Sequence, residues 1–248
     1  MLVRALRGVS DIVYCDVGAA HPVVDSISKS LHAHGWKGIH VEPVPTFASL
    51  LRAQRDGDVV VECGAGAADG EIDFWFVPGS GLSTTSQAEA DQALRRGFAV
   101  NRSAIRVRRL AEILDEHLAG RPLHALKVDV EGAERDVLLG ADLARFRPWI
   151  IVVEATRPGS TETTHELWDE LVLEAGYTFA MFDGLNRWYC STEHAELLPS
   201  LSYPACPLDG WIRAGLGYPA PVAGDAAAIQ AVAALEIASA YAQMRAAT

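Results

Sequence analysis

The sequence Leu126-Lys-Val-Asp-Val-Glu-Gly-Ala-Glu134 places three carboxylates and a glycine directly after an apolar segment with the pattern of a buried β-strand. Side chains alternate over 123–130, so Lys127 and Asp129 project from the face opposite to the apolar residues. The glycine allows a sharp turn, and the helix that follows is expected to end at Gly140. The stretch is either a plain strand-to-helix junction or a strand end of the kind where α/β enzymes place their chemistry.

Strand-like and helix-like segments alternate along the rest of the chain, which predicts an α/β fold with a doubly wound, mostly parallel sheet. The expected strands span 12–16, 38–41, 59–62, 72–77, 123–130, 149–154, 178–182 and 188–190. Helices are expected where apolar residues recur at helical spacing: Val23, Val24, Ile27 and Leu31; Phe47, Leu50 and Leu51; residues 110–118; and the segment after a capping box at Thr163-x-x-Glu166.

Two segments stand outside this alternation. Residues 78–103 are polar and rich in glycine and serine, which predicts a long loop that acts as a lid or is disordered. The alanine-rich segment 226–245 predicts a helix. We expect a domain over 1–205 and an extension over 206–248 that packs on it or forms a homodimer contact.

Composition limits the function classes. A chain of 248 residues, half of them hydrophobic, can bury one α/β core, and its net charge of −11 argues against nucleic acid or an anionic membrane as the main partner. Four scattered cysteines indicate neither a zinc site nor a disulfide framework. Without a signal-peptide pattern or a long apolar run, the expected protein is soluble and cytoplasmic, with reduced thiols.

Nearly every expected strand ends in a carboxylate. Ligands bind outside the carboxyl ends of the strands in such sheets, and clustered carboxylates repel one another unless a cation or hydrogen-bond donors lie between them. A cofactor or metal is therefore expected near these residues: Asp16, Glu42, Glu62, Asp129, Glu154 and Asp183.

The first turn, Asp16-Val-Gly-Ala-Ala-His21, has one glycine where a dinucleotide fingerprint needs three. A cofactor without phosphates fits better, and Glu42 is placed to accept hydrogen bonds from ribose hydroxyls. This arrangement is used for S-adenosylmethionine. The alternative is a tight turn beside an exposed Glu42.

Five motifs appear in order: Asp16-Val-Gly-Ala, Gly35-Trp-Lys-Gly-Ile-His-Val-Glu-Pro43, Gly81-Leu-Ser-Thr84, the stretch 126–134, and Phe182-Asp-Gly-Leu-Asn-Arg187. Together, over about residues 12–195, they resemble the FkbM family of S-adenosylmethionine-dependent methyltransferases. The resemblance implies a Rossmann-like class I fold with seven strands and methylation of a hydroxyl, frequently on a sugar. Family members often carry Asn where Ala20 stands. The expected cofactor contacts are Asp16, Gly18, Ala19, His21, Ser26, Glu42, Pro43, Gly64, Ser83 and Asp129.

An alcohol is a weak nucleophile, so a general base or a metal ion must activate it. Asp129 and Glu154 are the main candidates for both tasks, with Glu131 as a further catalytic carboxylate. Asp183 or Asn186 would complete a set of oxygen ligands for Mg²⁺. Alternatively, Asp129 holds the amino group of the cofactor while Lys127 pairs with Glu154.

Other polar residues allow a functional and a plain reading. His194 and His21 could each be a general base or a surface histidine, whereas His32, His34 and His40 belong to no recognisable group. Ser83 and Thr84 could close over the cofactor or form a turn. The arginines at 102, 106, 108 and 109 indicate a solvated face or a guide for an acidic acceptor.

The expected acceptor is a sugar hydroxyl of a bacterial glycan, of a polysaccharide precursor such as a methylated mannose or glucose oligosaccharide, or of a glycosylated metabolite. Carboxylates at the pocket, with Trp188 and Tyr189 close by in sequence, offer the acceptors and aromatic faces that carbohydrates need. The alternatives are O-methylation of a small molecule that is not a sugar, and a non-catalytic Rossmann-like binding protein. The missing glycines and the absence of a Tyr-x-x-x-Lys pair disfavour a nicotinamide-dependent oxidoreductase.

Overall fold

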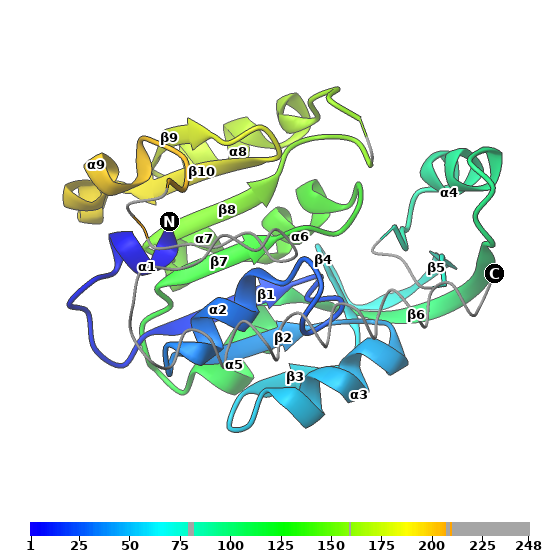
Figure 1. Cartoon of the computed structure of the whole chain (residues 1–248), viewed down its shortest axis with the longest axis horizontal. Helices are drawn as coiled ribbons and strands as arrows, with labels where there is room; N and C mark the ends of the chain where they lie inside the picture. The colour runs from blue at the N-terminus through cyan, green and yellow to red at the C-terminus, as the bar shows by residue number, and fades with distance from the viewer. Residues whose placement is uncertain (79–81, 159, 207–208, 210–248) are drawn as a thin grey trace, which may run out of the picture.

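A computed structural model describes residues 1–78, 82–158, 160–206 and 209 of the chain. These residues form an α/β fold around a seven-stranded sheet, as the sequence predicts (Figure 1). The strand order is β3 (Val59–Val61), β2 (Lys37–Val41), β1 (Val13–Val17), β7 (Ala125–Val128), β8 (Ile150–Glu154), β10 (Asn186–Ser191) and β9 (Tyr177–Phe182). Only β10 runs antiparallel to its neighbours. This is the strand order and direction of a Rossmann-like methyltransferase sheet.

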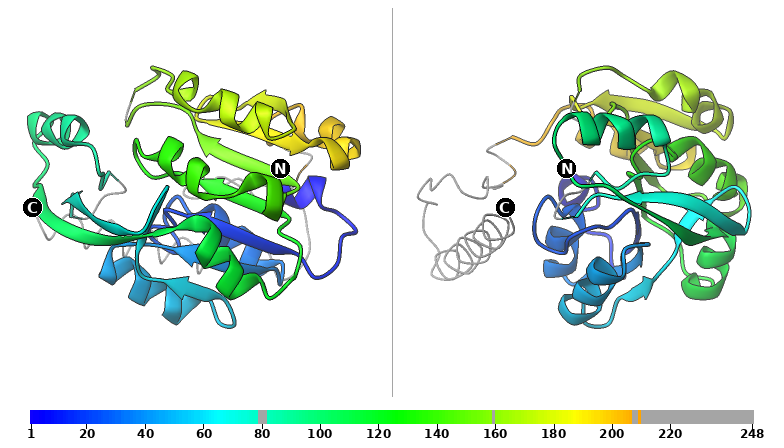
Figure 2. Two further views of the ribbon diagram at one scale, coloured as in Figure 1. Left: turned by 180° about the vertical axis from the view of Figure 1, so that it is seen from behind. Right: turned by 90° about the vertical axis from the view of Figure 1, so that its right-hand side faces the viewer.

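Helices cover both faces of the sheet because successive side chains of each buried strand point to opposite faces. On one face, α5 (Leu110–Leu118), α6 (Glu134–Gly140) and α8 (Asp169–Glu174) pack against the strands (Figure 2, left). On the other face lie α1 (Leu2–Ala5), α2 (Ile27–Ala33) and α9 (Leu198–Leu201). The strands β1 and β8 are buried along their whole length, and they contribute side chains to a separate hydrophobic cluster on each face of the sheet.

The remaining elements are short or peripheral. Helix α3 (Pro45–Gln54) packs beside β3 at one edge of the sheet, and α7 (Leu143–Phe146) follows α6. Two 3-10 helices, η1 (His165–Leu167) and η2 (Thr192–Leu197), precede α8 and α9.

A second sheet of three strands projects from the main one. It has the order β4 (Gly64–Gly66), β6 (Asn101–Arg109) and β5 (Gly70–Phe76), and α4 (Gln87–Arg95) lies at its far end (Figure 1). We call its described residues, 64–78 and 82–109, the flap. At the base of the flap, a Cβ on Gly140 would lie 1.8 Å from the carbonyl oxygen of Gly66, so α6 can pack on β4 only with glycine at this position.

The prediction of an unstructured loop over 78–103 was wrong. Helix α4 and the start of β6 lie in this region, and β6 pairs with β5 over seven residues. The arginines at 102, 106, 108 and 109 lie on β6. Arg102 pairs with Asp73 and Arg108 with Glu116. The exposed, charged strand lacks the apolar pattern that marks a buried strand, so the sequence does not reveal it.

Two helix starts were also predicted wrongly. Val23 and Val24 precede α2, because the side chain of Ser26 caps that helix by accepting from the backbone N–H of Lys29. The capping box at Thr163 does not form: its hydroxyl lies 3.5 Å from Glu166, no side chain caps η1, and α8 begins at Asp169.

The strand expected over 123–130 is shorter than predicted. Strand β7 ends at Val128, although the N–H of Asp129 still donates to the carbonyl of Val17 at 3.1 Å. Glu131 then takes a left-handed conformation with φ of 55°, which turns the chain before the glycine that follows it. As predicted, α6 opens at Glu134 and ends at Gly140.

The C-terminal predictions lie outside the described residues. This applies to the helix over 226–245, to a homodimer contact through it, and to the extension over 206–248 apart from Cys206 and Asp209. In the part of the chain that the structure describes, no helix has the length and apolar character needed to cross a membrane.

Candidate functional site

A pocket of about 1000 Å³ opens at the carboxyl ends of β1, β2, β7 and β8, between the main sheet and the flap. Its floor is formed by the loops that leave these strands. Apolar side chains of the flap, among them Phe74 and Val107, form its opposite wall. In an open α/β sheet, ligands bind in this position.

The first turn is shaped by a close approach of two backbones. Gly18 has φ of 73°, and a Cβ there would lie 1.8 Å from the carbonyl oxygen of Asp129. The N–H groups of Gly18 and Ala19 both donate to the carbonyl of Val41, at 2.9 and 3.3 Å. The turn is thus fixed between β2 and the end of β7 in a conformation that requires glycine.

Glu42 is buried at the end of β2 and ties that strand to the first turn. Its Oε2 accepts from the N–H of Ala20 at 2.7 Å, and its Oε1 accepts from the N–H of Val44 at 2.7 Å. Burial raises the pKa of Glu42 to about 7, and the two N–H groups oppose this shift. Each carboxylate oxygen keeps a second lone pair that can accept from a ligand in the pocket.

Lys127 joins three groups at the base of the pocket. Its Nζ lies 3.0 Å from Asp16 Oδ1 and 3.3 Å from Asp129 Oδ2, and it donates to the carbonyl of Gly18 at 2.8 Å. Burial alone would lower the pKa of Lys127, but the carboxylates of Asp129 and Asp16 outweigh it and raise the pKa. The predicted alternative, in which Lys127 pairs with Glu154, was therefore wrong.

Three carboxylates meet where the loop after β7 and the end of β8 border the pocket. One oxygen from each of Asp129, Glu131 and Glu154 lies within 4.8 Å of the others, and we call this group the carboxylate trio. Glu154 is 8% exposed, and one of its carboxyl oxygens lies within 4.8 Å of one of Asp129. Burial and then the charge of Asp129 raise the pKa of both Glu131 and Glu154 well above their usual range. The trio therefore holds protons that isolated carboxylates would release near pH 4.

The flap is fastened over the trio by two contacts. The hydroxyl of Thr84 donates to the carbonyl of Glu131 at 2.6 Å, and Arg157 pairs with Glu89 of α4 at 2.8 Å. Ser83 lines the pocket and accepts from the N–H of Val77 at 3.1 Å. These contacts place apolar flap side chains opposite the carboxylates.

The pocket brings together most of the residues singled out from the sequence. His21 lies at its rim, where Nδ1 accepts from the N–H groups of Val23 and Val24 at 3.1 Å each and so shapes the loop. The cofactor, metal or catalytic roles of the lining residues stay predictions. The predicted residues that line it are Asp16, Gly18, Ala19, His21, Ser26, Glu42, Pro43, Gly64, Ser83, Asp129, Glu131 and Glu154.

The prediction that His194 is a general base was wrong. Because β10 is antiparallel, its carboxyl end lies at the amino end of β8, and the N–H of Ser191 donates to the carbonyl of Trp149 there. His194 follows on η2 and stacks on Trp149 with ring centroids 3.8 Å apart. It therefore lies at the edge of the sheet opposite to the pocket.

Asp183 does not join the carboxylate trio, so its prediction as a metal ligand was wrong. Its carboxylate accepts from Trp188 Nε1 at 2.7 Å and from the N–H of Leu185 at 2.9 Å, which closes the turn between β9 and β10. Trp188 and Tyr189 are buried in the core and do not line the pocket. Glu62 also stays outside it, paired with Arg52 on the surface.

The sequence did not reveal the flap side of the pocket. Ile72 and Phe74 alternate on β5, which was predicted as a strand, but nothing local indicated that this strand leaves the main sheet. Ile105 and Val107 complete the apolar wall from β6.

Comparison with known proteins agrees with this geometry. Residues 16–179 match the family model of the methyltransferase FkbM domain. The chain belongs to the FkbM methyltransferase family. The match runs from Asp16, near the end of β1, to β9 and so includes β2, β7 and β8 in full. The protein is thus a methyltransferase by family, as the motifs predicted.

A more distant similarity links this FkbM methyltransferase to a much longer protein. The chain is 26% identical over 221 residues to the AMB antimetabolite synthetase AmbE of Pseudomonas aeruginosa. The alignment covers 73% of this chain and 10% of that protein. The chain therefore spans about a tenth of the length of this relative.

The raised pKa values of Glu131 and Glu154 predict how the stability of the ligand-free protein depends on pH. The pKa of Glu131 is raised to about 8 and that of Glu154 further, whereas an unfolded Glu titrates near pH 4.3. The folded state thus binds more protons between these values, and this stability is lost as pH rises through the folded pKa values. From pH 6 to pH 9, the parent should lose up to about 4 kcal/mol more stability than Glu154→Gln. Thermal or denaturant unfolding at constant ionic strength measures this difference.

As a control, Glu71→Gln, at an exposed position on β5, should show the same pH dependence of stability as the parent. Equal pH dependence of the parent and E154Q would contradict the assignment.

Proposed function

We propose that this FkbM methyltransferase transfers the methyl group of S-adenosylmethionine to a hydroxyl of a sugar, in a bacterial glycan, a polysaccharide precursor or a glycosylated metabolite. The observation that carries the proposal is the carboxylate trio in a pocket whose other end is built from the first turn and Glu42. One end suits an adenosine, and the other suits an alcohol that must lose a proton.

The cofactor end fits S-adenosylmethionine by its chemistry. Glu42 is buried and keeps free lone pairs toward the pocket, as recognition of two ribose hydroxyls requires. Among the described residues that line the pocket, Lys127 is the one lysine or arginine, and it is already engaged by Asp16 and Asp129. The pocket therefore favours a cofactor with a positive sulfonium and amino group over one with phosphates.

The chain's own residues account for the steps around the transfer. When bound, S-adenosylmethionine supplies an activated methyl group to an oxygen held in line with it. Asp129 is placed to hold the amino group of the cofactor, with its other charge contact at Lys127. The positive charge of the bound cofactor would lower the raised pKa values of Glu154 and Glu131, and the carboxylate that is then ionised accepts the proton of the acceptor hydroxyl as the new carbon–oxygen bond forms. The apolar flap wall keeps water from competing for the methyl group.

Removing the Glu42 carboxylate tests the cofactor assignment. Glu42→Ala should weaken S-adenosylmethionine binding by about 1.5 to 3 kcal/mol, because a charged hydrogen-bond acceptor is lost. Calorimetric titration of the cofactor measures the change. Glu62→Ala is the matched control, since it removes a carboxylate at the end of β3 that does not line the pocket. Parent-like affinity of E42A would sink the ribose assignment.

The trio also fits a divalent cation such as Mg²⁺. Asp129, Glu131 and Glu154 offer three hard oxygen ligands, and a cation there would lower the pKa of the acceptor hydroxyl. Activation of the hydroxyl by a metal ion and activation by a carboxylate base give different results with a chelator. If a metal activates the hydroxyl, protein treated with chelator should lose most methyl transfer and recover it when Mg²⁺ is added. Full activity after chelation would leave a carboxylate of the trio as the base.

A sugar suits the polar end of the acceptor site, where Glu131 and Glu154 can accept hydrogen bonds from ring hydroxyls. Trp188 and Tyr189 no longer support this choice, since both are buried elsewhere. The apolar wall of Ile72, Phe74 and Leu82 supports a second candidate, a hydroxyl on a small metabolite that is not a sugar. The similarity to a protein named as an antimetabolite synthetase also supports this second candidate.

A screen of acceptors separates the two candidates. Glycosides and hydroxylated non-sugar metabolites are offered with labelled S-adenosylmethionine under the same conditions. Methylation of a glycoside supports the sugar proposal. Methylation confined to non-sugar alcohols supports the second candidate and leaves the proposed O-methyl transfer standing.

A further inference from the structure

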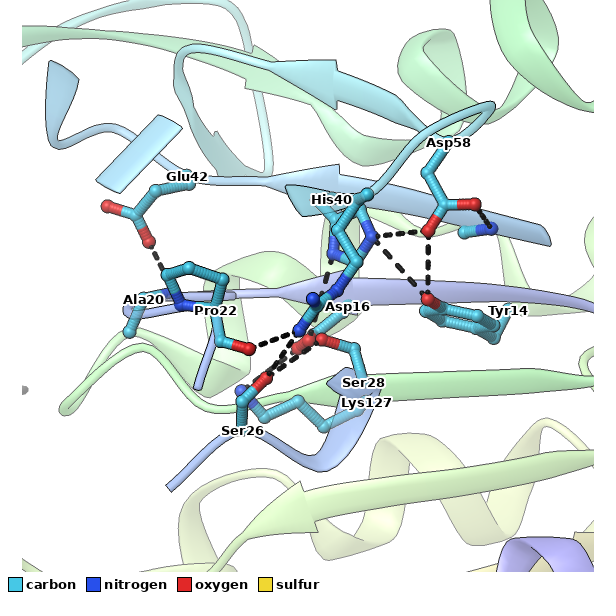
Figure 3. A network of polar contacts seen from close by, with 12 residues as sticks. Tyr14, Asp16, Ala20, Pro22, Ser26, Ser28, His40, Glu42, Asp58 and Lys127 are labelled. Carbon is cyan, nitrogen blue, oxygen red and sulfur yellow. Dashed lines mark hydrogen bonds and ion pairs between the residues drawn. The ribbon is translucent and has the colours of Figure 1, made fainter. Parts of the chain in front are cut away.

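His40 belongs to a buried polar network beneath the first turn (Figure 3). The side chain, on β2, is completely buried and does not line the pocket. Its Nε2 lies 3.0 Å from Oδ2 of Asp58. Its Nδ1 faces Oδ2 of Asp16 at 4.0 Å, which is longer than a hydrogen bond, and no described residue forms a hydrogen bond with this nitrogen. The parallel register of β1 and β2 sets Asp16 opposite His40, so the backbone itself fixes this arrangement.

Asp58 anchors the ring. Its side chain is fully buried, its Oδ1 accepts from the N–H of Gly38 at 3.0 Å, and its Oδ2 accepts from the hydroxyl of Tyr14 and lies 3.1 Å from Nδ1 of His32. Burial alone would raise the pKa of Asp58, but the contacts with His40 and Gly38 outweigh it and lower the pKa. A carboxylate held ionised in this way accepts from Nε2 of His40, so the ring cannot rotate without losing a charged hydrogen bond.

Asp16 is the connection between this network and the pocket. Its side chain is 4% exposed, lines the pocket, and has two groups beside it that can balance its charge, Lys127 at 3.0 Å and His40 at 4.0 Å. Lys127 also holds the carbonyl of Gly18. A change in the orientation of Asp16 would therefore be transmitted to the turn on which the cofactor is proposed to lie.

We propose that His40 is a positioning residue for methyl transfer. Its ring is anchored on Asp58 through Nε2, and its Nδ1 edge limits the positions that the carboxylate of Asp16 can take beside Lys127. The inference rests on the proposed cofactor, because its effect is read in the affinity for S-adenosylmethionine. His40 touches neither the cofactor nor the acceptor and acts through Asp16 alone.

Two substitutions separate the two ring nitrogens. The amide of Asn reaches the position of Nδ1, so His40→Asn keeps a donor toward Asp16 and loses the contact with Asp58. The longer Gln reaches the position of Nε2, so His40→Gln keeps Asp58 and loses Asp16. We expect H40N to have the lower Tm of the two. In calorimetric titration with S-adenosylmethionine, we expect H40Q to bind about tenfold more weakly than the parent and H40N within about threefold of it.

His32→Ala is the matched control. It removes another partner of Asp58 but has no contact with Asp16, and its affinity for the cofactor should equal that of the parent. A merely structural role of His40 would make the loss of affinity follow the loss of Tm, with H40N affected more than H40Q. That order, or equal affinities of H40Q and the parent, would overturn the inference.

A double-mutant cycle covers the case in which H40N does not fold. If His40 acts through Asp16, the variant D16N/H40Q should bind S-adenosylmethionine as tightly as D16N alone. If D16N and H40Q each weaken binding independently, so that their fold-losses of affinity multiply in the double variant, the inference is overturned. If the parent itself does not bind the cofactor, the proposed function fails, and the inference fails with it. If the parent binds S-adenosylmethionine and H40Q and H40N bind it with equal affinity, only the positioning role of His40 is overturned.

Discussion

Replacing Glu154 with Gln should lower the rate of methyl transfer by about 10²- to 10⁴-fold, the usual contribution of a positioned acid or base. Glu154 is buried at the end of β8, lies in the carboxylate trio and lines the pocket. Gln keeps the size of the side chain but can neither take a proton nor balance a cation. The loss should appear in kcat, with the affinity for S-adenosylmethionine changed little, because the proposed cofactor contacts are Asp16, Glu42 and Asp129.

The rate and the cofactor affinity are measured on the same preparation of E154Q. Glu62→Gln serves as the control, since this carboxylate also ends a strand but is exposed and paired with Arg52. It should retain the activity of the parent. A fully active E154Q would remove Glu154 from the reaction and leave Glu131 or Asp129 as the group that takes the proton.

Replacing Gly18 with Ala should destabilise the protein by about 4 kcal/mol or more, a size of effect that a single substitution reaches through backbone strain or overpacking. The added Cβ would lie 1.8 Å from a carbonyl oxygen at the end of β7 and would be strained at φ of 73°. Neither backbone can yield easily, because both are hydrogen-bonded into the centre of the sheet.

Gly8→Ala is a close control for G18A. Gly8 has φ of 87°, but a Cβ there meets nothing within 4 Å, so only the cost of the left-handed conformation remains, about 1 to 2 kcal/mol. Chemical denaturation of the two variants and the parent measures both the cost of the left-handed conformation and the additional cost of the close contact at Gly18. A free energy of unfolding for G18A equal to that of G8A would contradict the close approach of the first turn to β7.

The sequence predicted the main sheet well because its strands are short apolar runs that end in polar residues. Burial of β1 and β8 on both faces leaves a continuous hydrophobic signal, which sequence patterns detect. The exposed, arginine-rich β6 has no such signal. Its partner β5 was recognised as a strand, but the separation of both from the main sheet is a long-range property.

The same difference, between local apolar patterns and long-range arrangement, explains which site residues could be predicted from the sequence. Residues at strand ends could be placed because the carboxyl ends of parallel strands share one edge of the sheet. His194 lies at the opposite edge from the one predicted because β10 runs antiparallel to β8. The short turn from Asp183 to Asn186 contains the signal, since two strands joined so closely must be antiparallel.

The polar network at His40 could not be predicted from local patterns. Asp58 lies in a loop, and Tyr14 and His40 come from different strands, so the sheet register alone brings the three together. A buried histidine on a strand is uninformative until its partners are known.

The proposed transfer of a methyl group from S-adenosylmethionine to a sugar hydroxyl is tested most directly by the fate of the label. The parent and E154Q are each incubated with S-adenosylmethionine labelled in the methyl group and a panel of glycosides, and the products are analysed by mass spectrometry. The account predicts that the parent places the label on an oxygen of at least one glycoside and that E154Q does so at least 100-fold more slowly. Label transferred only to nitrogen or carbon, or equally fast by E154Q, would contradict it.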